Sequence, residues 1–189
     1  MNPKRTQILK TARALFWKFG IKRVSIEEIC REANLSKMTF YKHFENKNDL
    51  VIAILKHLQN DAFQKYRDIM DQDIPFPEKI ERSIQLKIEQ TDNLSKEFFT
   101  DLHKNASEEV LAYFQSMYQE GIQLILQDYI EAQKRGEIRP DVKPEFIVYF
   151  LNQMITMSND PELQALYKSP QEVIMELLRF FFYGILPRS

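Results

Sequence analysis

The sequence predicts an all-α protein in which a three-helix N-terminal head is joined by a long fourth helix to a C-terminal helical bundle, with about nine helices in total. Only four of the 189 residues are glycine. Apolar residues recur at helical spacing along most of the chain, and no run alternates apolar and polar residues for long enough to indicate a strand. A chain of this length can bury a sizeable core.

The first helix is expected over residues 3–19. Apolar side chains recur there at helical spacing, which gives the segment one apolar face, and Gly20 follows as a C-terminal stop. The members of this face are Ile8, Leu9, Ala12, Leu15, Phe16 and Phe19.

Two short helices joined by a tight turn are expected next. Ser25 and Glu28 have the spacing of a capping box at the start of the first one. Asn34 stands where a left-handed turn residue is expected, and Ser36 can cap the second one, which is predicted to run through His43.

A much longer fourth helix follows, and Asn46 is its expected cap. Its apolar stripe extends from Val51 to Met70. Because the stripe outlasts the small head by several turns, this helix is expected to connect the head to the body of the protein.

Six further helices are predicted beyond the prolines of "DQDIPFPEK". Gly136 ends one of them, and Pro144 and Pro161 occupy first-turn positions of two others. Ser169 and Glu172 have capping-box spacing around a first-turn proline. The predicted ranges are 76–91, 95–104, 108–135, 144–158, 161–168 and 170–186.

Charge is distributed unevenly along the chain. Residues 1–50 carry 11 lysines and arginines against 5 acidic residues, whereas residues 51–189 carry 15 against 22. The balances are therefore +6 and −7. Such a division favours a basic head that meets a polyanion and an acidic body with another task, although chance clustering on solvated helix faces is the simpler alternative.

The single cysteine, Cys30, allows no intramolecular disulfide and no cysteine-based zinc site of ordinary ligand count. It is expected to be a small buried apolar residue. The N-terminal residues lack the apolar run of a signal peptide, and no stretch approaches 18 uninterrupted apolar residues. We expect a cytoplasmic protein with no membrane segment, no metal and no cofactor.

Residues 25–44 have the layout of a helix-turn-helix, whose second helix enters the major groove of DNA. Phe40 and Phe44 lie four residues apart and can pack inward. No acidic residue occurs between Asn34 and Phe44. Cations, hydroxyls and a flexible apolar side chain can hold phosphates and touch base edges. The outward positions are Lys37, Met38, Thr39, Tyr41, Lys42 and His43.

Residues 8–50 resemble the TetR-type bacterial transcriptional regulators. They match a first helix that ends in F-x-x-x-G, a second helix reading S-I-E-E-I-C-R-E-A, and the signature S-K-x-T-F-Y-x-H-F-x-N-K-x-x-L. The match covers about 43 residues, so it is far more specific than a short motif.

The resemblance implies a role for each matching position. Lys37, Met38 and Thr39 correspond to positions that face base edges. Phosphate contacts are implied for Ser25, Tyr41, Lys42, His43 and Lys47. Two departures from the family pattern stand out: Asn34 replaces the common turn glycine, and Met38 replaces the commoner glycine or proline.

Three of these side chains have alternative interpretations. Tyr41 could belong to the core, and Lys47 could be a solvated lysine. His43 could act as a helix C-terminal cap that favours the helix dipole.

The resemblance also implies a helical body that dimerises through its last two long helices and encloses a small-molecule site. Residues 144–158 and 170–186 carry apolar stripes wide enough for a core face and part of an interface. A mostly apolar lining suits an apolar or amphipathic effector. The candidate lining residues are Phe98, Phe99, Tyr113, Phe114, Met117, Tyr118, Tyr129 and Met154, any of which could instead be ordinary core.

We therefore expect a sequence-specific DNA-binding transcriptional regulator, with residues 1–48 as the DNA-binding domain and residues 49–189 as the ligand-binding and dimerisation domain. The resemblance implies a repressor that binds a palindromic operator as a homodimer and is released by a small, mostly apolar effector.

Two other classes of protein are alternatives to a DNA-binding regulator. An enzyme is disfavoured because the three histidines, at 43, 57 and 103, show no metal-ligand spacing and the chain has no phosphate-binding glycine loop or nucleophile motif. A helical adaptor for an acidic protein stays open. Salt dependence distinguishes the two. In a DNA-binding protein, each neutralised phosphate adds about 0.9 to the slope with which the logarithm of the binding constant falls with the logarithm of the salt concentration.

Overall fold

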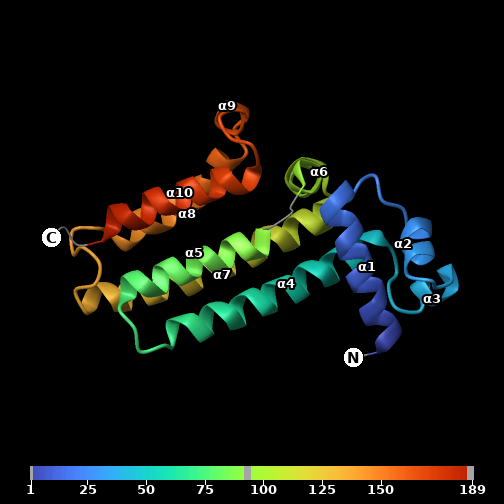
Figure 1. Ribbon diagram of the computed structural model, residues 1–189, viewed down its shortest axis with the longest axis horizontal. Helices are drawn as coiled ribbons and strands as arrows, with labels where there is room; N and C mark the ends of the chain where they lie inside the picture. The colour runs from blue at the N-terminus through green and yellow to red at the C-terminus, as the bar shows by residue number, and fades with distance from the viewer. Residues whose placement is uncertain (1, 92–94, 187–189) are drawn as a thin grey trace. The chain divides into compact units, whose positions relative to one another are not determined.

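The computed structural model describes residues 2–91 and 95–186. These residues contain ten α-helices and one π-helical segment, and they contain no strand (Figure 1). The predicted all-α fold is confirmed. The described residues contain the ten α-helices predicted element by element, one more than the stated total of about nine.

The first four helices are α1 (Pro3–Phe19), α2 (Ile26–Glu32), α3 (Lys37–Tyr41) and α4 (Lys47–Met70). Helices α1, α2 and α4 have the predicted limits. Helix α3 ends two residues before the predicted His43, because the His43 N–H donates to the carbonyl of Phe40, only three residues back, at 2.9 Å. This tighter turn closes the helix.

The predicted caps are present. Ser25 accepts from the N–H of Glu28 at 3.1 Å, and Ser36 accepts from the N–H of Thr39 at 3.1 Å. Asn34 adopts the left-handed conformation with φ 50°. Each short helix is therefore limited by side-chain oxygens that satisfy its first free N–H groups.

The remaining helices follow the predicted order with two differences. The segment predicted as one helix over 95–104 is a short α-helix that widens into a π-helix, and the predicted helix 161–168 is three residues shorter. The elements are α5 (Phe76–Thr91), α6 (Lys96–Thr100), a π-helix (Asp101–Asn105), α7 (Glu108–Lys134), α8 (Pro144–Ser158), α9 (Pro161–Ala165) and α10 (Pro170–Ile185).

The residues group into two compact units by their contacts. Unit 1 comprises residues 1–60 and 93–117, and unit 2 comprises residues 61–92 and 118–189. Helices α4 and α7 therefore contribute to both units. The functional division after residue 48 stays a prediction, since it concerns activity rather than packing.

Unit 1 joins the head to the segment around the π-helix. The Lys22 N–H donates to Oδ2 of Asp101 at 2.7 Å, and the rings of Trp17 and Phe98 lie 4.5 Å apart between centroids. Gly20, with φ 83°, approaches the same carboxylate so closely that a Cβ there would lie 2.6 Å from Oδ2. Only glycine fits this position without displacing Asp101.

The π-helix lies in an anchored part of unit 1. Asp101 and Leu102 are 8 % and 5 % exposed there, and Phe98 and Phe99 of α6 are similarly buried at 5 % and 7 %. The predicted single helix is therefore interrupted where Asp101 accepts the hydrogen bond from Lys22, just after α1.

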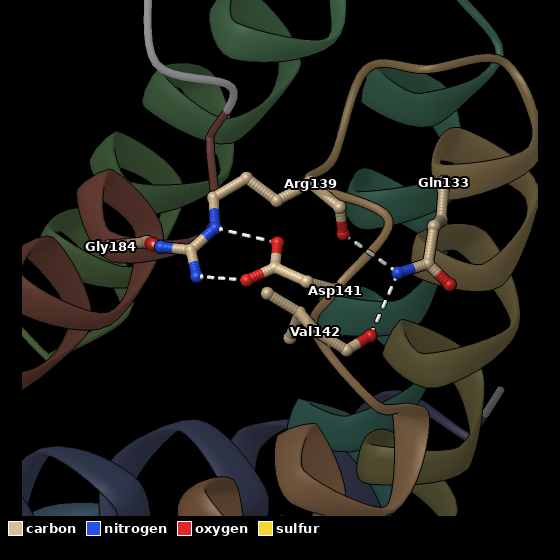
Figure 2. Close-up of polar contacts among 5 residues, drawn as sticks. All are labelled: Gln133, Arg139, Asp141, Val142 and Gly184. Atoms are coloured by element: carbon tan, nitrogen blue, oxygen red, sulfur yellow. Dashed lines mark hydrogen bonds and ion pairs between the residues drawn. The ribbon is translucent and has the colours of Figure 1, made fainter.

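Unit 2 contains its own core, to which α5, α7, α8 and α10 contribute. The connection from α7 to α8 is fastened by polar contacts (Figure 2). Gln133 donates to the carbonyls of Arg139 and Val142 at 2.8 and 2.7 Å, and the Arg139 guanidinium donates to the carbonyl of Gly184 at 2.9 Å. These contacts satisfy carbonyls of the connection and of the last turn of α10.

His103 predicts a pH dependence of stability. It lies in unit 1 between the rings of Phe99 and Phe114, with centroids 4.4 and 5.0 Å away. Burial lowers the pKa of His103 from 6.5 to about 4. Between these values the unfolded chain binds a proton that the folded chain does not, so the free energy of unfolding should fall as the pH drops, by about 2 kcal/mol at pH 5.

Urea unfolding at pH 7.5 and pH 5, followed by circular dichroism, measures this effect. The His103→Phe variant keeps the ring contacts and removes the titrating group, so it should lose about 2 kcal/mol less than the wild type over the same interval. Equal losses in the two proteins would contradict the prediction.

Among the described residues, no helix combines the length and the hydropathy needed to cross a bilayer.

Candidate functional site

Helix α3 has a buried side and an exposed side, as predicted. Phe40 and Phe44 are 0 % and 2 % exposed, and their ring centroids lie 5.7 Å apart. Met38 and Tyr41 are 68 % and 55 % exposed. The alternative that Tyr41 belongs to the core is therefore wrong. Met38, a large apolar residue, is exposed at the start of the helix, where a residue that contacts base edges in the groove would be needed.

Lys37 is exposed at the start of α3, where it forms an ion pair with Glu27 of α2. This contact lowers the pKa of Glu27 and raises the pKa of Lys37 through their hydrogen bond. Glu27 could not be identified from the sequence, because its pairing with Lys37 depends on how the two helices pack. Because of this ion pair, Lys37 must give up its contact with Glu27 in order to bind any ligand.

The remaining predicted contact residues on and next to α3 are Thr39, Lys42 and His43. The Thr39 hydroxyl lies 3.0 Å from the Ser36 hydroxyl, within hydrogen-bond distance. Lys42 is exposed, whereas Thr39 and His43 are half-buried. All the predicted positions of α3 except the inward pair therefore reach solvent to some degree.

Lys47 has a structural role, so the alternative that it is only a solvated lysine is wrong. Its ammonium donates to the carbonyls of Ile21 and Val24 at 3.0 and 3.1 Å and to that of Lys22 at 3.5 Å. It thereby fastens the connection between α1 and α2 to the start of α4. A phosphate contact by Lys47 stays a prediction, and it would be made by a side chain already held in place.

Two arginines of the head could not be identified as candidate contacts from the sequence. The Arg5 guanidinium lies 5.0 Å from the centroid of Phe44, and the Arg23 guanidinium lies 4.3 Å from the centroid of Phe19. Arginine held over a ring keeps its donors free for phosphate. The only signal in the sequence was the general excess of basic residues in the first 50 positions.

The predicted ligand-lining residues are divided between the two units. Five of them lie in unit 1 and three in unit 2. Phe98 packs on Trp17 and Tyr129 packs on Phe76, with centroids 5.7 Å apart in the second pair, so both contribute to ordinary core. Unit 2 has a cavity between α4 and α7, lined by Phe63 and Gln127, and another between α4 and α5, lined by Lys65 and Leu86. None of the eight predicted residues lines either cavity, and their role in a ligand site stays a prediction.

The sequence profile described as "Bacterial regulatory proteins, tetR family" matches residues 8–54. These residues are α1, α2, α3 and the start of α4, the elements that carry the exposed surface described above. The head of the chain, residues 8–54, therefore matches the TetR family. The protein is a DNA-binding transcriptional regulator.

Similarity to two HTH-type transcriptional regulators extends beyond the head. The HTH-type transcriptional regulator UidR of Escherichia coli is 29 % identical over 144 residues, which cover 75 % of this chain and 72 % of that protein. The HTH-type transcriptional repressor KstR2 of Mycobacterium tuberculosis is 20 % identical over 154 residues, which cover 80 % and 77 %.

The solved structure of GusR from Salmonella enterica has the same fold. It superposes with a TM-score of 0.70 at 22 % identity and covers 97 % of this chain and 98 % of GusR. At this identity the likeness concerns the fold alone. It shows that the body of this chain shares the helical architecture of GusR.

The division of α3 and α4 into base-reading and phosphate-holding residues predicts two distinct phenotypes. Lys47→Ala should weaken DNA binding about equally on all sequences. Thr39→Ala should lose on the order of 1–3 kcal/mol preferentially at particular base pairs. Fluorescence anisotropy with specific and scrambled duplexes measures both effects. Equal losses on every sequence from both variants would refute the division.

Proposed function

We propose that the protein represses transcription as a homodimer on a palindromic operator, with residues 1–48 binding DNA and residues 49–189 binding an effector and the second subunit. The observation that carries this proposal is the surface of α3, where Met38 and Tyr41 stand in solvent above a buried Phe40. The name of the relative KstR2, a transcriptional repressor, supports repression as the mode. A cytoplasmic location belongs to the same proposal.

The proposed dimer face lies on α8 and α10. Large apolar side chains on these two helices are exposed, and an exposed apolar patch of this kind is typical of a protein interface. They are Phe146 at 53 %, Tyr149 at 61 %, Met157 at 37 %, Phe180 at 76 % and Tyr183 at 63 %.

Helices α8 and α10 pack on each other within unit 2 and are drawn side by side in Figure 1. The rings of Phe150 and Phe181 stack between them at 5.0 Å, and Arg139 holds the end of α10 next to the connection that leads into α8. A fixed pair of helices can form the same face in both copies, as a two-fold dimer requires. Two recognition helices about 34–36 Å apart would then read a palindrome.

The effector is proposed to act through the helices shared by the two units. Residues 47–60 of α4 belong to unit 1 and residues 61–70 to unit 2, and α7 is divided in the same way. An effector that binds unequally to the DNA-competent and released states would change operator affinity through these helices. A ligand that saturates the protein without changing operator affinity would contradict this coupling for that ligand.

Selection of bound duplexes from a random DNA pool is the decisive experiment. The wild-type chain should enrich a palindrome with half-sites about one helical turn apart. Its affinity for the enriched duplex should fall steeply with salt. Enrichment of a single half-site would contradict the dimer. No enrichment at all would favour the adaptor for an acidic protein.

A further inference from the structure

One peptide group in the connection between α1 and α2 is held at both ends by side chains of opposite charge. Its carbonyl, which belongs to Ile21, accepts from the Lys47 ammonium at 3.0 Å. Its N–H, which belongs to Lys22, donates to Oδ2 of Asp101 at 2.7 Å. Hydrogen bonds to charged groups are stronger than neutral ones, and bonds at the two ends of one peptide group polarise each other. The Ile21–Lys22 peptide is therefore firmly fixed.

The Asp101 carboxylate occupies a position that is specific for this contact. Its side chain is buried, and its second oxygen, Oδ1, accepts from the side-chain amide of Asn105 at 3.0 Å. A buried carboxylate is costly unless hydrogen bonds replace its water. Gly20 leaves the space that Oδ2 occupies. Asp101 thus reaches the connection from a position where an exposed acidic residue could not.

The segment that carries Asp101 is itself attached to α1. The N–H of Ser95 donates to the carbonyl of Trp17 at 3.1 Å, and the ring of Phe98 packs on that of Trp17. All these residues belong to unit 1. The carboxylate is therefore a fixed point against which the connection between α1 and α2 is held.

The residues that follow the held peptide group suit contacts with DNA phosphates. Lys22, Arg23 and Ser25 are exposed. The Arg23 guanidinium lies over the ring of Phe19, which keeps its donors available. Cations and hydroxyls of this kind hold the phosphate backbone. The direction in which they point depends on the peptide group from which the connection continues.

We propose that Asp101 is a positioning residue for DNA binding, although it lies outside the proposed DNA-binding domain of residues 1–48. It does not touch DNA. It holds the Ile21–Lys22 peptide so that Lys22 and Arg23 reach phosphates. This inference rests on the DNA-binding role of the head and adds a residue of the body to the parts that DNA binding requires.

The salt dependence of duplex binding by the full chain tests the proposal. Fluorescence anisotropy between about 50 and 200 mM salt gives the affinity and the logarithmic slope. Asp101→Leu keeps the branched shape of the side chain and removes the acceptor. It should weaken binding by about tenfold or more and lower the slope by about 0.9 for each phosphate contact that is lost. A folding defect alone would reduce the active fraction of protein and leave the slope unchanged.

Two further variants define the cause. Asp101→Asn keeps an acceptor oxygen for the Lys22 N–H, so it should retain most of the affinity and of the slope. Glu109→Leu is the matched control, since Glu109 is an exposed acidic residue of α7 in unit 1 and the change of charge is the same. It should not weaken binding. A wild-type slope in folded Asp101→Leu would overturn the proposal.

The same peptide group can be released from its other end if Asp101→Leu does not fold, as judged by Trp17 fluorescence. Lys47→Met removes the donor to the Ile21 carbonyl and one predicted phosphate contact. Its slope should fall by more than the roughly 0.9 that this one contact explains, because Lys22 and Arg23 would also lose their positions. A smaller fall would overturn the proposal.

The outcomes separate this inference from the function on which it rests. A wild-type chain that binds no duplex would contradict DNA binding itself. A wild-type chain that binds DNA with a steep salt dependence, together with variants of unchanged slope, would remove only the positioning role of Asp101.

Discussion

Replacing Phe40 by alanine is expected to lower the free energy of unfolding of unit 1 by about 3–5 kcal/mol. Phe40 is 0 % exposed and contacts the rings of Phe44 and Tyr41, with centroids 5.7 and 5.4 Å away. Helix α3 has only five residues, too few to be stable without this anchor. The cavity left by the missing ring would therefore destabilise α3, which carries the exposed surface that is proposed to read DNA.

Urea unfolding followed by tryptophan fluorescence measures this loss, because Trp17 is the single tryptophan and lies in unit 1. Tyr41→Ala is the matched control: Tyr41 is the next residue of the same helix and is 55 % exposed. It should cost less than about 1 kcal/mol of stability while weakening DNA binding. Losses of stability of similar size in the two variants would show that the helix has no distinct inner face.

The double variant Tyr149→Glu/Phe180→Glu is expected to convert a dimer into a monomer. Both side chains are exposed, at 61 % and 76 %, on the two helices of the proposed interface. Acidic residues would meet their symmetry copies there, and like charges buried together are strongly unfavourable. Affinity for a palindrome should fall by at least about 100-fold, because each head would bind its half-site alone.

Light scattering and anisotropy measure the two consequences. The mass should fall from twice the chain mass to the 22.6 kDa of one chain. Leu166→Glu is the control: Leu166 is 77 % exposed but follows α9, outside the proposed interface. It should change neither mass nor affinity. A double variant that remains dimeric would place the interface elsewhere.

Most helix limits could be predicted because their signals are local. Ser25, Ser36 and Asn46 each satisfy an N–H three residues away. Asn34 supplies a backbone conformation that depends mainly on its own side chain. The inward pair, Phe40 and Phe44, follows from helical periodicity alone.

The anchoring of the π-helix could not be predicted, because the partner of Asp101 is remote in the sequence. Asp101 accepts a hydrogen bond from Lys22, which is 79 positions away in the sequence. The requirement for glycine at position 20 could not be predicted for the same reason, because the missing side chain makes room for the distant Asp101 carboxylate. A propensity summed over a short window has no access to such contacts.

The sequence by itself determined the all-helical class, the helix-turn-helix head and the side of α3 that faces solvent, because periodicity and capping act between residues three or four positions apart. Only the tertiary structure decided that Lys37 is paired with Glu27 and that Lys47 is held by loop carbonyls. The state of a charged side chain depends on which distant groups replace its water, and packing alone brings those groups together.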